Sequence, residues 1–332
     1  MKGLLYIILL IFIGGSRQDL KSVVLSGHAQ GTTWNVTYFN DDSTVLKNSI
    51  DSIFDSIDSS LSIYKPYSII TAFNKSEKGV KADGHVVNVV NFSTYFAKET
   101  QGLADITVGP LTQAWGFGTS HPDSMPGDQQ IEKLRACVGF KNIGISNDSL
   151  IKRKPCVKID VNGIAQGYTV DVIADYLEAK GIKDYLIEVG GELRSKGRKP
   201  GSKPFQVGIE SPSDNDFDIS PFQQIISLED GAITTSGNYR KYFESKGRRF
   251  SHIIDPRTGR SVNNEMISVT VYAAKATYAD ALDNAFMVMG VKDALKYVEE
   301  KRGLAAYIIY KDENGNIKDT ASTRFRQLVV HR

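Results

Sequence analysis

One segment of the chain, residues 157–197, constrains the fold more than any other, because it joins two apolar runs through an amphipathic helix. Its first five residues, VKIDV, alternate apolar and charged side chains, which predicts a strand. A short loop with two glycines, NGIAQG, comes next, and apolar residues then recur at helical spacing before Gly181. The run YLIEV at residues 185–189 predicts a second strand, so the segment is expected to form a strand, a helix and a strand in succession.

The loop between the first strand and the helix has the composition of a ligand site. It places the carboxylate of Asp160 and exposed backbone beside a helix N-terminus, where a phosphate group is favoured. It does not match the glycine-rich fingerprints of dinucleotide-binding or P-loop proteins. Any strand-to-helix crossover needs small residues at its turn, so the loop alone leaves a purely structural role open.

The overall composition is that of a globular protein and gives no indication of nucleic-acid binding. Of the 332 residues, 41% are hydrophobic and 23% are charged, which suits one large domain or two subdomains. The net charge is only +2. The basic clusters Arg194-Lys196-Arg198-Lys199 and Arg248-Arg249 are interpreted as solvated loop charge.

Periodicity and turn residues predict the remaining elements. Strands are expected at residues 32–39, 205–210, 224–228, 232–235, 250–254, 267–274 and 304–310. Helices are expected at residues 41–61, 86–100, 128–137, 277–289 and 292–301, with Asp42, Ser43 and Asp128 as N-terminal caps. Residues 62–74 are interpreted as a loop. Many strands with interspersed helices predict an α+β fold rather than a doubly wound parallel sheet.

The N-terminus has the pattern of an export signal. Lys2 precedes a short apolar run over residues 3–13, and small residues follow up to Ser16. A lipoprotein signal would carry cysteine where Ser16 stands, so lipidation is not predicted. The expected organisation is an export signal or N-terminal anchor at residues 1–16, a linker at 17–26 and one domain at 27–332. This predicts a protein that is periplasmic or held at the outer face of the cytoplasmic membrane.

The two cysteines, Cys137 and Cys156, leave two states open. In an oxidising compartment they could form a disulfide. Two buried free thiols fit the sequence equally well.

The clearest candidate for a metal site lies in the predicted helix at residues 277–289. Asp280, Asp283 and Asn284 share one face at helical spacing and offer oxygen ligands, which suit Mg²⁺ or Ca²⁺ rather than zinc. The alternative is a T-x-x-D capping box formed by Thr277 and Asp280. Capping does not account for Asp283 and Asn284 beside an apolar run, so both interpretations stay open.

Two further motifs contain candidate catalytic or phosphate-binding groups. His252 lies just before DPRTG, residues 255–259, which is a turn by composition. A lone histidine is more often structural, and proximity to a metal would distinguish the two roles. The hydroxyls and glycine of residues 234–239, TTSGNY, could hold phosphate or could simply end a strand.

Taken together, these motifs resemble the ApbE family of FAD:protein FMN transferases. The matching pieces, in family order, are ADITVGPL at 104–111 with WGFG at 115–118, IDVNGIAQGY at 159–168, VGGE at 189–192, TTSGNY at 234–239, HIIDPRTG at 252–259 and ADAL at 279–282. The resemblance covers residue 27 to the C-terminus. It implies an α+β fold with mixed or antiparallel sheets and flanking helices in two intimately packed subdomains.

The resemblance also implies an activity. Family members are exported, Mg²⁺-dependent enzymes that cleave the FAD pyrophosphate, join FMN through a phosphoester to a threonine of an acceptor protein and release AMP. Their acceptors include subunits of the sodium-pumping NADH:quinone oxidoreductase and related redox complexes. The same site would also permit an FAD pyrophosphatase that gives FMN and AMP, and a non-catalytic FAD-binding carrier is a third possibility.

The site residues implied by the resemblance fall into three sets. The metal ligands would be Asp280, Asp283, Asn284 and the backbone carbonyl of Gly163. The FAD-contacting residues would be Gln30, Tyr64, Asp105, Ile106, Thr107, Asp160, Gln166 and Ile254. The catalytic residues would be Asp280, through the metal, and His252 as base for the acceptor hydroxyl. The chain departs from the family pattern at Asn284 (usually threonine), Gln166 (usually lysine) and Gln30 (commonly methionine), and Tyr67 is an alternative to Tyr64.

Overall fold

The structure is a computed structural model that describes residues 20–40, 45–119, 125–211, 222–238, 242–245 and 248–330. The predicted export signal, the cap candidates Asp42 and Ser43, and Tyr239 lie outside these residues. Among the described residues, no helix combines the length and the apolar character needed to cross a bilayer.

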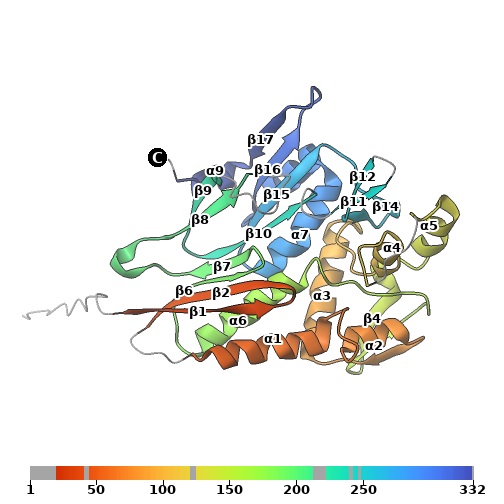
Figure 1. The fold of residues 1–332 in the computed structure, drawn as a ribbon, viewed down its shortest axis with the longest axis horizontal. Helices are drawn as coiled ribbons and strands as arrows, with labels where there is room; N and C mark the ends of the chain where they lie inside the picture. Colours follow the sequence, from red (N-terminus) through yellow and green to blue (C-terminus); the bar gives the residue numbers. More distant parts are fainter. Residues whose placement is uncertain are drawn as a thin grey trace, which may run out of the picture.

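One antiparallel sheet of eight strands organises the chain, in the order β1-β2-β6-β7-β10-β15-β16-β17 (Figure 1). Its strands are β1 Lys21–Ala29, β2 Thr32–Asn40, β6 Asp184–Val189, β7 Glu192–Lys196, β10 Gly231–Gly237, β15 Met266–Ala273, β16 Ala305–Lys311 and β17 Ile317–Ala321. Each pair of neighbouring strands in this sheet is antiparallel, so the predicted α+β class with antiparallel sheets is confirmed.

Smaller sheets flank the large one. They pair β3 Gly79–Lys81 and β4 Ile143–Ser146 with β5 Ser149–Lys152, β8 Phe205–Glu210 with β9 Phe222–Leu228, β11 Tyr242–Ser245 with β12 Arg248–Ser251, and β13 Ile254–Asp255 with β14 Arg260–Ser261. The helices are α1 Lys47–Leu61, α2 Ile69–Lys75, α3 Gly84–Glu99, α4 Gly109–Ala114, α5 Asp128–Arg135, α6 Ala165–Ala179, α7 Ala276–Met289, α8 Val291–Glu300 and α9 Thr323–Leu328.

The large sheet is buried on both faces near its centre. Ala306 and Ile308 of β16 join the cluster that contains α7, whereas Tyr307 and Ile309 join a cluster on the opposite face with Phe325 of α9. Because side chains alternate along a strand, this explains why β15 and β16 are almost continuously apolar. On the first face, α6 contacts β6 and β7, α7 contacts β10 and β15, and the two helices contact each other.

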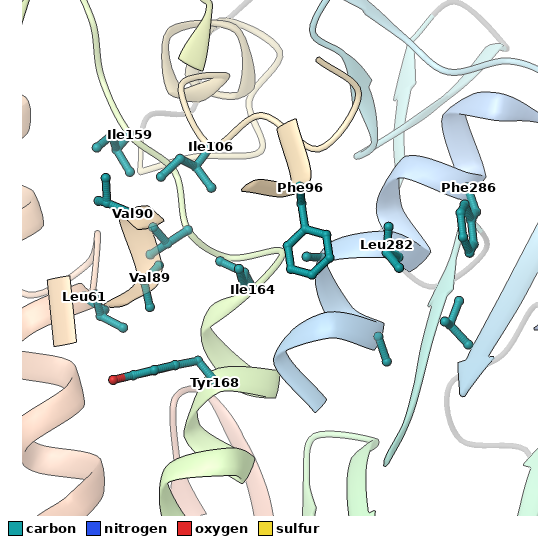
Figure 2. Close-up of a cluster of buried hydrophobic side chains, with 14 of the residues drawn as sticks. Leu61, Val89, Val90, Phe96, Ile106, Ile159, Ile164, Tyr168, Leu282 and Phe286 are labelled. Carbon is teal, nitrogen blue, oxygen red and sulfur yellow. The ribbon is translucent and has the colours of Figure 1, made fainter. Parts of the chain in front are cut away.

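The main apolar cluster fixes the loop after residue 157 against the helices. Figure 2 shows Leu61 of α1, Val89, Val90 and Phe96 of α3, and Leu282 and Phe286 of α7 in one cluster with Ile106, Ile159 and Ile164. All are buried. Burial of these side chains brings residues 157–164, called the central loop below, and α7 into one core, although they are more than a hundred residues apart in sequence.

Most of the elements predicted within residues 157–197 are confirmed. The helix forms as α6, and Gly181 follows its end with a φ of +79°, a backbone conformation that favours glycine. The second strand forms as β6. The predicted strand at residues 157–161 is wrong: among the described residues, its only strand-like pairing is one isolated bridge between Val108 and Lys158.

The side chain of Asn74 explains why residues 157–161 need no neighbouring strand. Asn74 Oδ1 accepts from the Ile159 amide (2.7 Å), and its Nδ2 donates to the Ile159 carbonyl (2.8 Å). The Asp160 amide donates to the Ile106 carbonyl (2.8 Å). A side chain and a loop therefore satisfy the backbone groups that a sheet would otherwise satisfy.

Several predicted boundaries are also wrong. The supposed loop at residues 62–74 contains the start of α2, where Ser68 Oγ caps the helix by accepting from the Thr71 amide (3.0 Å). Helix α1 begins only at Lys47, and Leu46 at its N-cap makes no side-chain bond. Helix α5 has Gly127 at the N-cap, so Asp128 lies in its first turn and is not the cap.

Three further expectations are wrong because of tertiary contacts. The linker expected at residues 17–26 is wrong from Lys21 onward, because β1 pairs with β2 along its whole length. The strand expected at 250–254 divides into β12 and β13, with a break at His252 and Ile253. Arg194, interpreted as solvated loop charge, is instead buried in β7.

Cys137 and Cys156 form a disulfide, with Cα atoms 5.6 Å apart. The bond decides between the two states that the sequence left open. It joins the chain just after α5 to the residue before the 157–161 segment, so it fixes the start of the central loop.

Candidate active site

A cavity of about 680 Å³ lies where the central loop, α1, α3 and α7 meet. This volume is typical of sites for small molecules and cofactors. Among its lining residues are most of the predicted site residues: Gln30, Tyr64, Asp105, Ile106, Asp160, Gly163, Gln166, His252, Ile254 and Asn284. Thr107, Asp280 and Asp283 do not line it.

Thr107 does not line the cavity itself but binds Asp105, which does. Its amide and hydroxyl both donate to Asp105 Oδ1 (2.8 and 2.6 Å), and the Phe140 amide donates to Asp105 Oδ2 (2.7 Å). Burial raises the pKa of Asp105, while these hydrogen bonds from Thr107 and Phe140 act to lower it. Asp105 therefore holds the wall together with both of its oxygens, and Thr107 has no direct access to a ligand.

The 160–163 loop is fixed at the mouth of the cavity. Asp160 accepts from the Asn162 amide (3.0 Å) and the Thr112 hydroxyl (2.9 Å), and burial raises its pKa. Asn162 Nδ2 donates to the Tyr64 hydroxyl (3.2 Å). Tyr64 lines the cavity and Tyr67 does not, so the geometry favours the Tyr64 alternative.

Gln30 occupies the turn between β1 and β2 at another edge of the cavity. Its φ of +52° and that of Gly31, +75°, belong to a tight two-residue hairpin turn. Gln30 Nε2 donates to the Thr169 hydroxyl (2.9 Å), whereas its buried Oε1 has no hydrogen-bond partner in the described structure. The orphaned acceptor lies on a residue of the cavity wall, where a bound ligand could satisfy it.

Helix α7 brings its polar residues against the central loop. Asp280 Oδ2 accepts from the Gly167 amide (2.8 Å). A Cβ added to Gly163 would lie 2.9 Å from Asn284 Nδ2, so the loop touches the helix at this point. The structure therefore brings together Gly163, Asp280 and Asn284, which the resemblance placed in one metal site.

Hydroxyls of β10 hold the polar side chains of α7. The Thr234 hydroxyl donates to Asp283 Oδ2 (2.7 Å), and the Ser236 hydroxyl donates to Asn284 Oδ1 (3.2 Å). Asn284 Nδ2 in turn donates to Asp283 Oδ1 (3.0 Å). Neither Thr234 nor Ser236 lines the cavity, so these hydroxyls orient the α7 carboxylate and amide, and the phosphate-binding alternative that the sequence left open is not favoured.

The capping-box alternative for Thr277 and Asp280 is wrong. The N-cap of α7 is Lys275, which makes no side-chain bond, and Thr277 is the second helical residue. Asp171 of α6 caps α7 instead, by accepting from the amides of Ala276 (3.1 Å) and Thr277 (2.9 Å). Asp280 therefore does not cap its own helix; its Oδ2 accepts from the amide of Gly167 in the first turn of α6.

Three carboxylates are buried together behind the cavity. Burial is the main cause that raises the pKa of Asp280, to about 7, while the Gly167 amide acts against it. Burial and the neighbouring Asp280 raise the pKa of Asp283. Burial, Asp280 and Asp283 raise the pKa of Glu192, a residue that the sequence did not single out as a ligand. Glu192 Oε2 is buried without a hydrogen-bond partner in the described structure.

This arrangement suits a divalent cation. Mutually repelling carboxylates in a low-dielectric interior are stabilised by a nearby positive charge, and in the described part of the chain no lysine, arginine or histidine forms an ion pair with Asp280, Asp283 or Glu192. The described residues contain no group of three or more His, Cys, Asp or Glu side chains placed to hold a metal. Mg²⁺ commonly takes one or two carboxylates from the protein and completes its coordination shell with substrate phosphates and water. A site with fewer than three such side chains as ligands therefore still fits Mg²⁺.

His252 lies on the cavity wall, at the break between β12 and β13. Its ring contacts Phe117 edge-on, with centroids 6.3 Å apart. The turn after it forms as predicted, with the Gly259 amide donating to the Asp255 carbonyl (2.8 Å). Trp115 Nε1 donates to the Gly259 carbonyl (2.8 Å), which joins the WGFG and DPRTG motifs.

Comparison with known proteins shows which family the sequence matches. The sequence profile of the ApbE family matches residues 30–308. The chain is 37% identical over 324 residues to the FAD:protein FMN transferase of Vibrio cholerae, covering 96% of both chains. It is 36% identical over 317 residues to the protein of the same name from Escherichia coli K12, covering 92% of this chain and 89% of the relative.

Solved structures agree in fold. The flavin transferase ApbE from Vibrio cholerae superposes with a TM-score of 0.82 at 36% identity, covering 93% of this chain and 99% of the other. The apo form of the Pseudomonas stutzeri flavinyl transferase ApbE superposes with a TM-score of 0.83 at 31% identity, covering 93% and 97%.

Proposed function

This chain belongs to the ApbE family and is a flavin transferase, and from that premise we propose that it moves FMN from FAD to a threonine hydroxyl of an acceptor protein in a Mg²⁺-dependent reaction that releases AMP. One observation carries the proposal. The central loop at Gly163 meets Asn284 of α7 at the wall of a cofactor-sized cavity, and buried carboxylates lie directly behind this contact.

The proposed cation ligands are Asp280, Asp283, Asn284 and the Gly163 carbonyl. When bound there, Mg²⁺ would neutralise charge on the FAD pyrophosphate. The ligands are held in advance by Gly167, Thr234 and Ser236, so their orientation does not depend on the substrate. Such preorganisation is the main contribution that a protein makes to phosphoryl transfer.

The cavity would hold FAD through its mixed apolar and polar wall. Ile106 and Ile254 supply apolar surface, and the orphaned Gln30 Oε1 supplies an acceptor for a ligand N–H or O–H. Gln166, where the family usually has lysine, would contact the nucleotide without adding charge. At position 166 the proposed binding therefore relies on hydrogen bonding and not on a basic side chain.

His252 is the proposed general base. In the reaction, the acceptor threonine oxygen bonds to the FMN phosphorus and the bond from that phosphorus to the bridging oxygen breaks. The hydroxyl proton passes to His252, and AMP leaves with the bridging oxygen. The position of His252 on the cavity wall is the observation that supports this role.

We propose further that the protein acts after export, on an acceptor subunit of a membrane redox complex of the sodium-pumping NADH:quinone oxidoreductase type. The disulfide between Cys137 and Cys156 supports an oxidising compartment, since such bonds persist in the periplasm and are rare in the cytosol. The hydrophobic run at residues 3–13 supports export or membrane attachment.

Mass spectrometry of the acceptor tests the proposed function. The purified protein is incubated with FAD, Mg²⁺ and an acceptor domain, and the expected result is an acceptor heavier by one FMN group with an equal amount of AMP. An acceptor whose target threonine is replaced by valine should remain unmodified. An acceptor of unchanged mass would contradict the transferase activity. Release of FMN and AMP in the absence of acceptor would indicate an FAD pyrophosphatase. Binding of FAD without release of AMP would indicate a carrier protein.

A further inference from the structure

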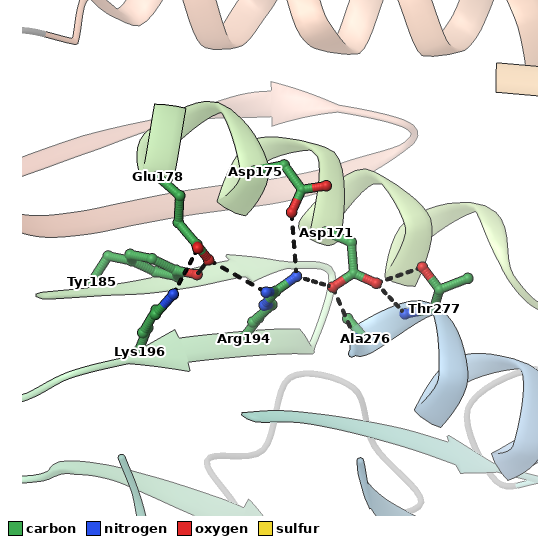
Figure 3. Close-up of polar contacts among 8 residues, drawn as sticks. All are labelled: Asp171, Asp175, Glu178, Tyr185, Arg194, Lys196, Ala276 and Thr277. Carbon is green, nitrogen blue, oxygen red and sulfur yellow. Dashed lines mark hydrogen bonds and ion pairs between the residues drawn. The ribbon is translucent and has the colours of Figure 1, made fainter. Parts of the chain in front are cut away.

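The carboxylate of Asp171 joins three elements that carry the candidate site (Figure 3). Asp171 lies on α6 and is buried. Its Oδ1 accepts from Arg194 Nη1 on β7 (2.7 Å) and from the Ala276 amide (3.1 Å). Its Oδ2 accepts from the amide (2.9 Å) and the hydroxyl (2.5 Å) of Thr277. One side chain on α6 is therefore bonded to both β7 and the first turn of α7.

Each of these elements contributes a residue to the proposed cation site or to the carboxylate cluster beside it. Helix α6 begins just after the Gly163 loop and supplies the Gly167 amide that binds Asp280. Helix α7 carries Asp280 one turn after Ala276 and Thr277. Strand β7 begins with Glu192, two residues before Arg194 and on the same face of the sheet. Asp171 thus links all three elements directly.

The first two amides of α7, those of Ala276 and Thr277, depend on Asp171 for their hydrogen bonds. The first amides of a helix have no partner within the helix, and the side chain of Lys275 at the N-cap supplies none. A carboxylate at this end also interacts favourably with the helix dipole. Because the cap comes from α6 rather than from α7 itself, it also fixes the position of one helix relative to the other.

Arg194 holds the capping carboxylate in place. Its guanidinium pairs with Asp171 at 2.7 Å and more loosely with Glu178 at 3.4 Å and Asp175 at 3.9 Å. Glu178 also accepts from Lys196 (2.6 Å) and from the Tyr185 hydroxyl (2.8 Å), as Figure 3 shows. The orientation of Asp171 is therefore fixed from the sheet side as well as from α7.

We propose that Asp171 is a positioning residue for the divalent-cation site. By tying the start of α7 to α6 and β7, it sets the distance and rotation of Asp280 relative to the Gly163 loop, and so controls cation affinity without touching cation or FAD. The inference rests on the proposed function for the presence of a cation. Groups that orient metal ligands from outside typically change metal affinity by about 10- to 100-fold when replaced.

Mn²⁺ binding to the full-length protein without FAD, followed by electron paramagnetic resonance, tests the inference. Asp171→Asn keeps an acceptor oxygen but removes the charge, and we expect Mn²⁺ affinity to fall at least about 10-fold. Thr277→Val removes one hydrogen bond and leaves the Asp171–Arg194 pair intact, so it should shift affinity in the same direction by less. Asp175→Asn is the matched control, because Asp175 is on the same helix, faces the same arginine at 3.9 Å and is 64% exposed.

Hydrogen exchange separates positioning from simple stabilisation. In Asp171→Asn the amides of Ala276 and Thr277 should exchange faster, while the other α7 amides stay protected. In the same variant, the KM for FAD at saturating Mg²⁺ should change less than two-fold. The inference would be overturned if Asp171→Asn and Thr277→Val both keep the Mn²⁺ affinity of the unmodified protein while Asp280→Ala loses Mn²⁺ binding. That result would still support the proposed cation site. Full Mn²⁺ binding by Asp280→Ala would overturn the proposed cation site itself.

Discussion

The backbone amide of Gly167 donates a 2.8 Å hydrogen bond to Oδ2 of Asp280, and this bond ties the start of α6 to the middle of α7. A Cβ at position 167 would lie 2.5 Å from the Ala276 carbonyl oxygen and 2.7 Å from the Asp280 Cβ. Such distances are too short for real Cβ atoms. Glycine is therefore required at 167 because two helices approach there, not because of its backbone angles.

We expect Gly167→Ala to force α6 and α7 apart. The unfolding free energy should fall by about 1–3 kcal/mol, as for other overpacked sites, and flavin transfer should fall about 10-fold or more as Asp280 moves. Urea denaturation and the acceptor mass assay measure the two effects. Gly84→Ala is the control, since a Cβ at the first residue of α3 meets nothing within 4 Å. Wild-type stability and activity in Gly167→Ala would show that the close approach is dispensable.

The raised pKa of Asp280 predicts an unusual pH dependence for the metal-free protein. The pKa is raised from 3.8 to about 7, so the folded state favours the protonated carboxyl. The stability that this group contributes is then fully present below about pH 4 and is lost as the pH rises to about 7. In EDTA, Tm should fall between pH 5 and pH 8, and Asp280→Asn should reduce the fall. An identical pH profile in the variant would contradict the assignment.

Mg²⁺ should act in the opposite direction. Metal ligands must be deprotonated, so Mg²⁺ should raise Tm more at pH 8 than at pH 6. Differential scanning fluorimetry with and without MgCl₂ measures the difference, and Asp280→Asn should lose most of it. An equal Mg²⁺ effect at both pH values would show that the cation binds elsewhere.

Glu192→Gln should stabilise the metal-free protein. The substitution removes a buried carboxyl group whose ionisation is disfavoured by burial and by Asp280 and Asp283, while the amide oxygen can still accept from the Thr235 amide. We expect a gain of about 1–2 kcal/mol in unfolding free energy at pH 8, measured by urea denaturation in EDTA. Glu229→Gln, at an exposed ion pair with Arg198, should change stability by less than about 0.5 kcal/mol. A loss of stability in Glu192→Gln would mean that the charge is compensated in the folded state.

The sequence predicted the elements whose pattern is local. Helix α6 and strand β6 follow from spacing that a short window contains, and the acidic face of α7 follows from i, i+3 and i+4 positions. The strand at 157–161 failed because Asn74, 85 residues away, satisfies the Ile159 backbone on both sides. No local pattern reveals a partner at that separation.

Strand β7 was missed for a related reason. Its sequence, ELRSK, is polar and shows no apolar alternation, so it suggests exposed loop. Arg194 can be buried there only because Asp171 of α6 neutralises it, and Glu192 joins the acidic cluster only because β7 pairs with β10 beneath α7. The one signal for this strand in the sequence was that Glu192 and Arg194, two residues apart, follow the Gly190-Gly191 turn. That spacing does not show which residues they would contact.

The disulfide between Cys137 and Cys156 should stabilise the protein by about 3 kcal/mol, the amount expected for closing a loop of this size. We expect urea denaturation of the Cys137→Ala/Cys156→Ala double variant to show a loss of that order. Reducing agent should destabilise the unmodified protein but not the double variant. Equal stability with and without reductant in the unmodified protein would contradict a structural bond.

Tyr64 and Tyr67 offer a direct test of how FAD enters the cavity. Both side chains are exposed, at 62% and 66%, but only Tyr64 lines the cavity and bonds to Asn162 of the central loop. An exposed aromatic ring at a cavity mouth can stack on a flavin or an adenine, a contact worth about 1–1.5 kcal/mol. Tyr64→Ala should therefore raise the Kd for FAD about 10-fold, measured by calorimetry with Mg²⁺ omitted to prevent turnover.

Tyr67→Ala is the matched control for this prediction, because it removes an equally exposed ring three residues away. Its Kd should stay within two-fold of the unmodified protein. Tyr64→Phe separates the ring from the hydroxyl: retention of affinity would assign the effect to stacking, and a loss would assign it to the bond that holds Asn162. If instead Tyr67→Ala weakens FAD binding and Tyr64→Ala does not, the flavin lies further along the α1–α2 connection than the cavity implies.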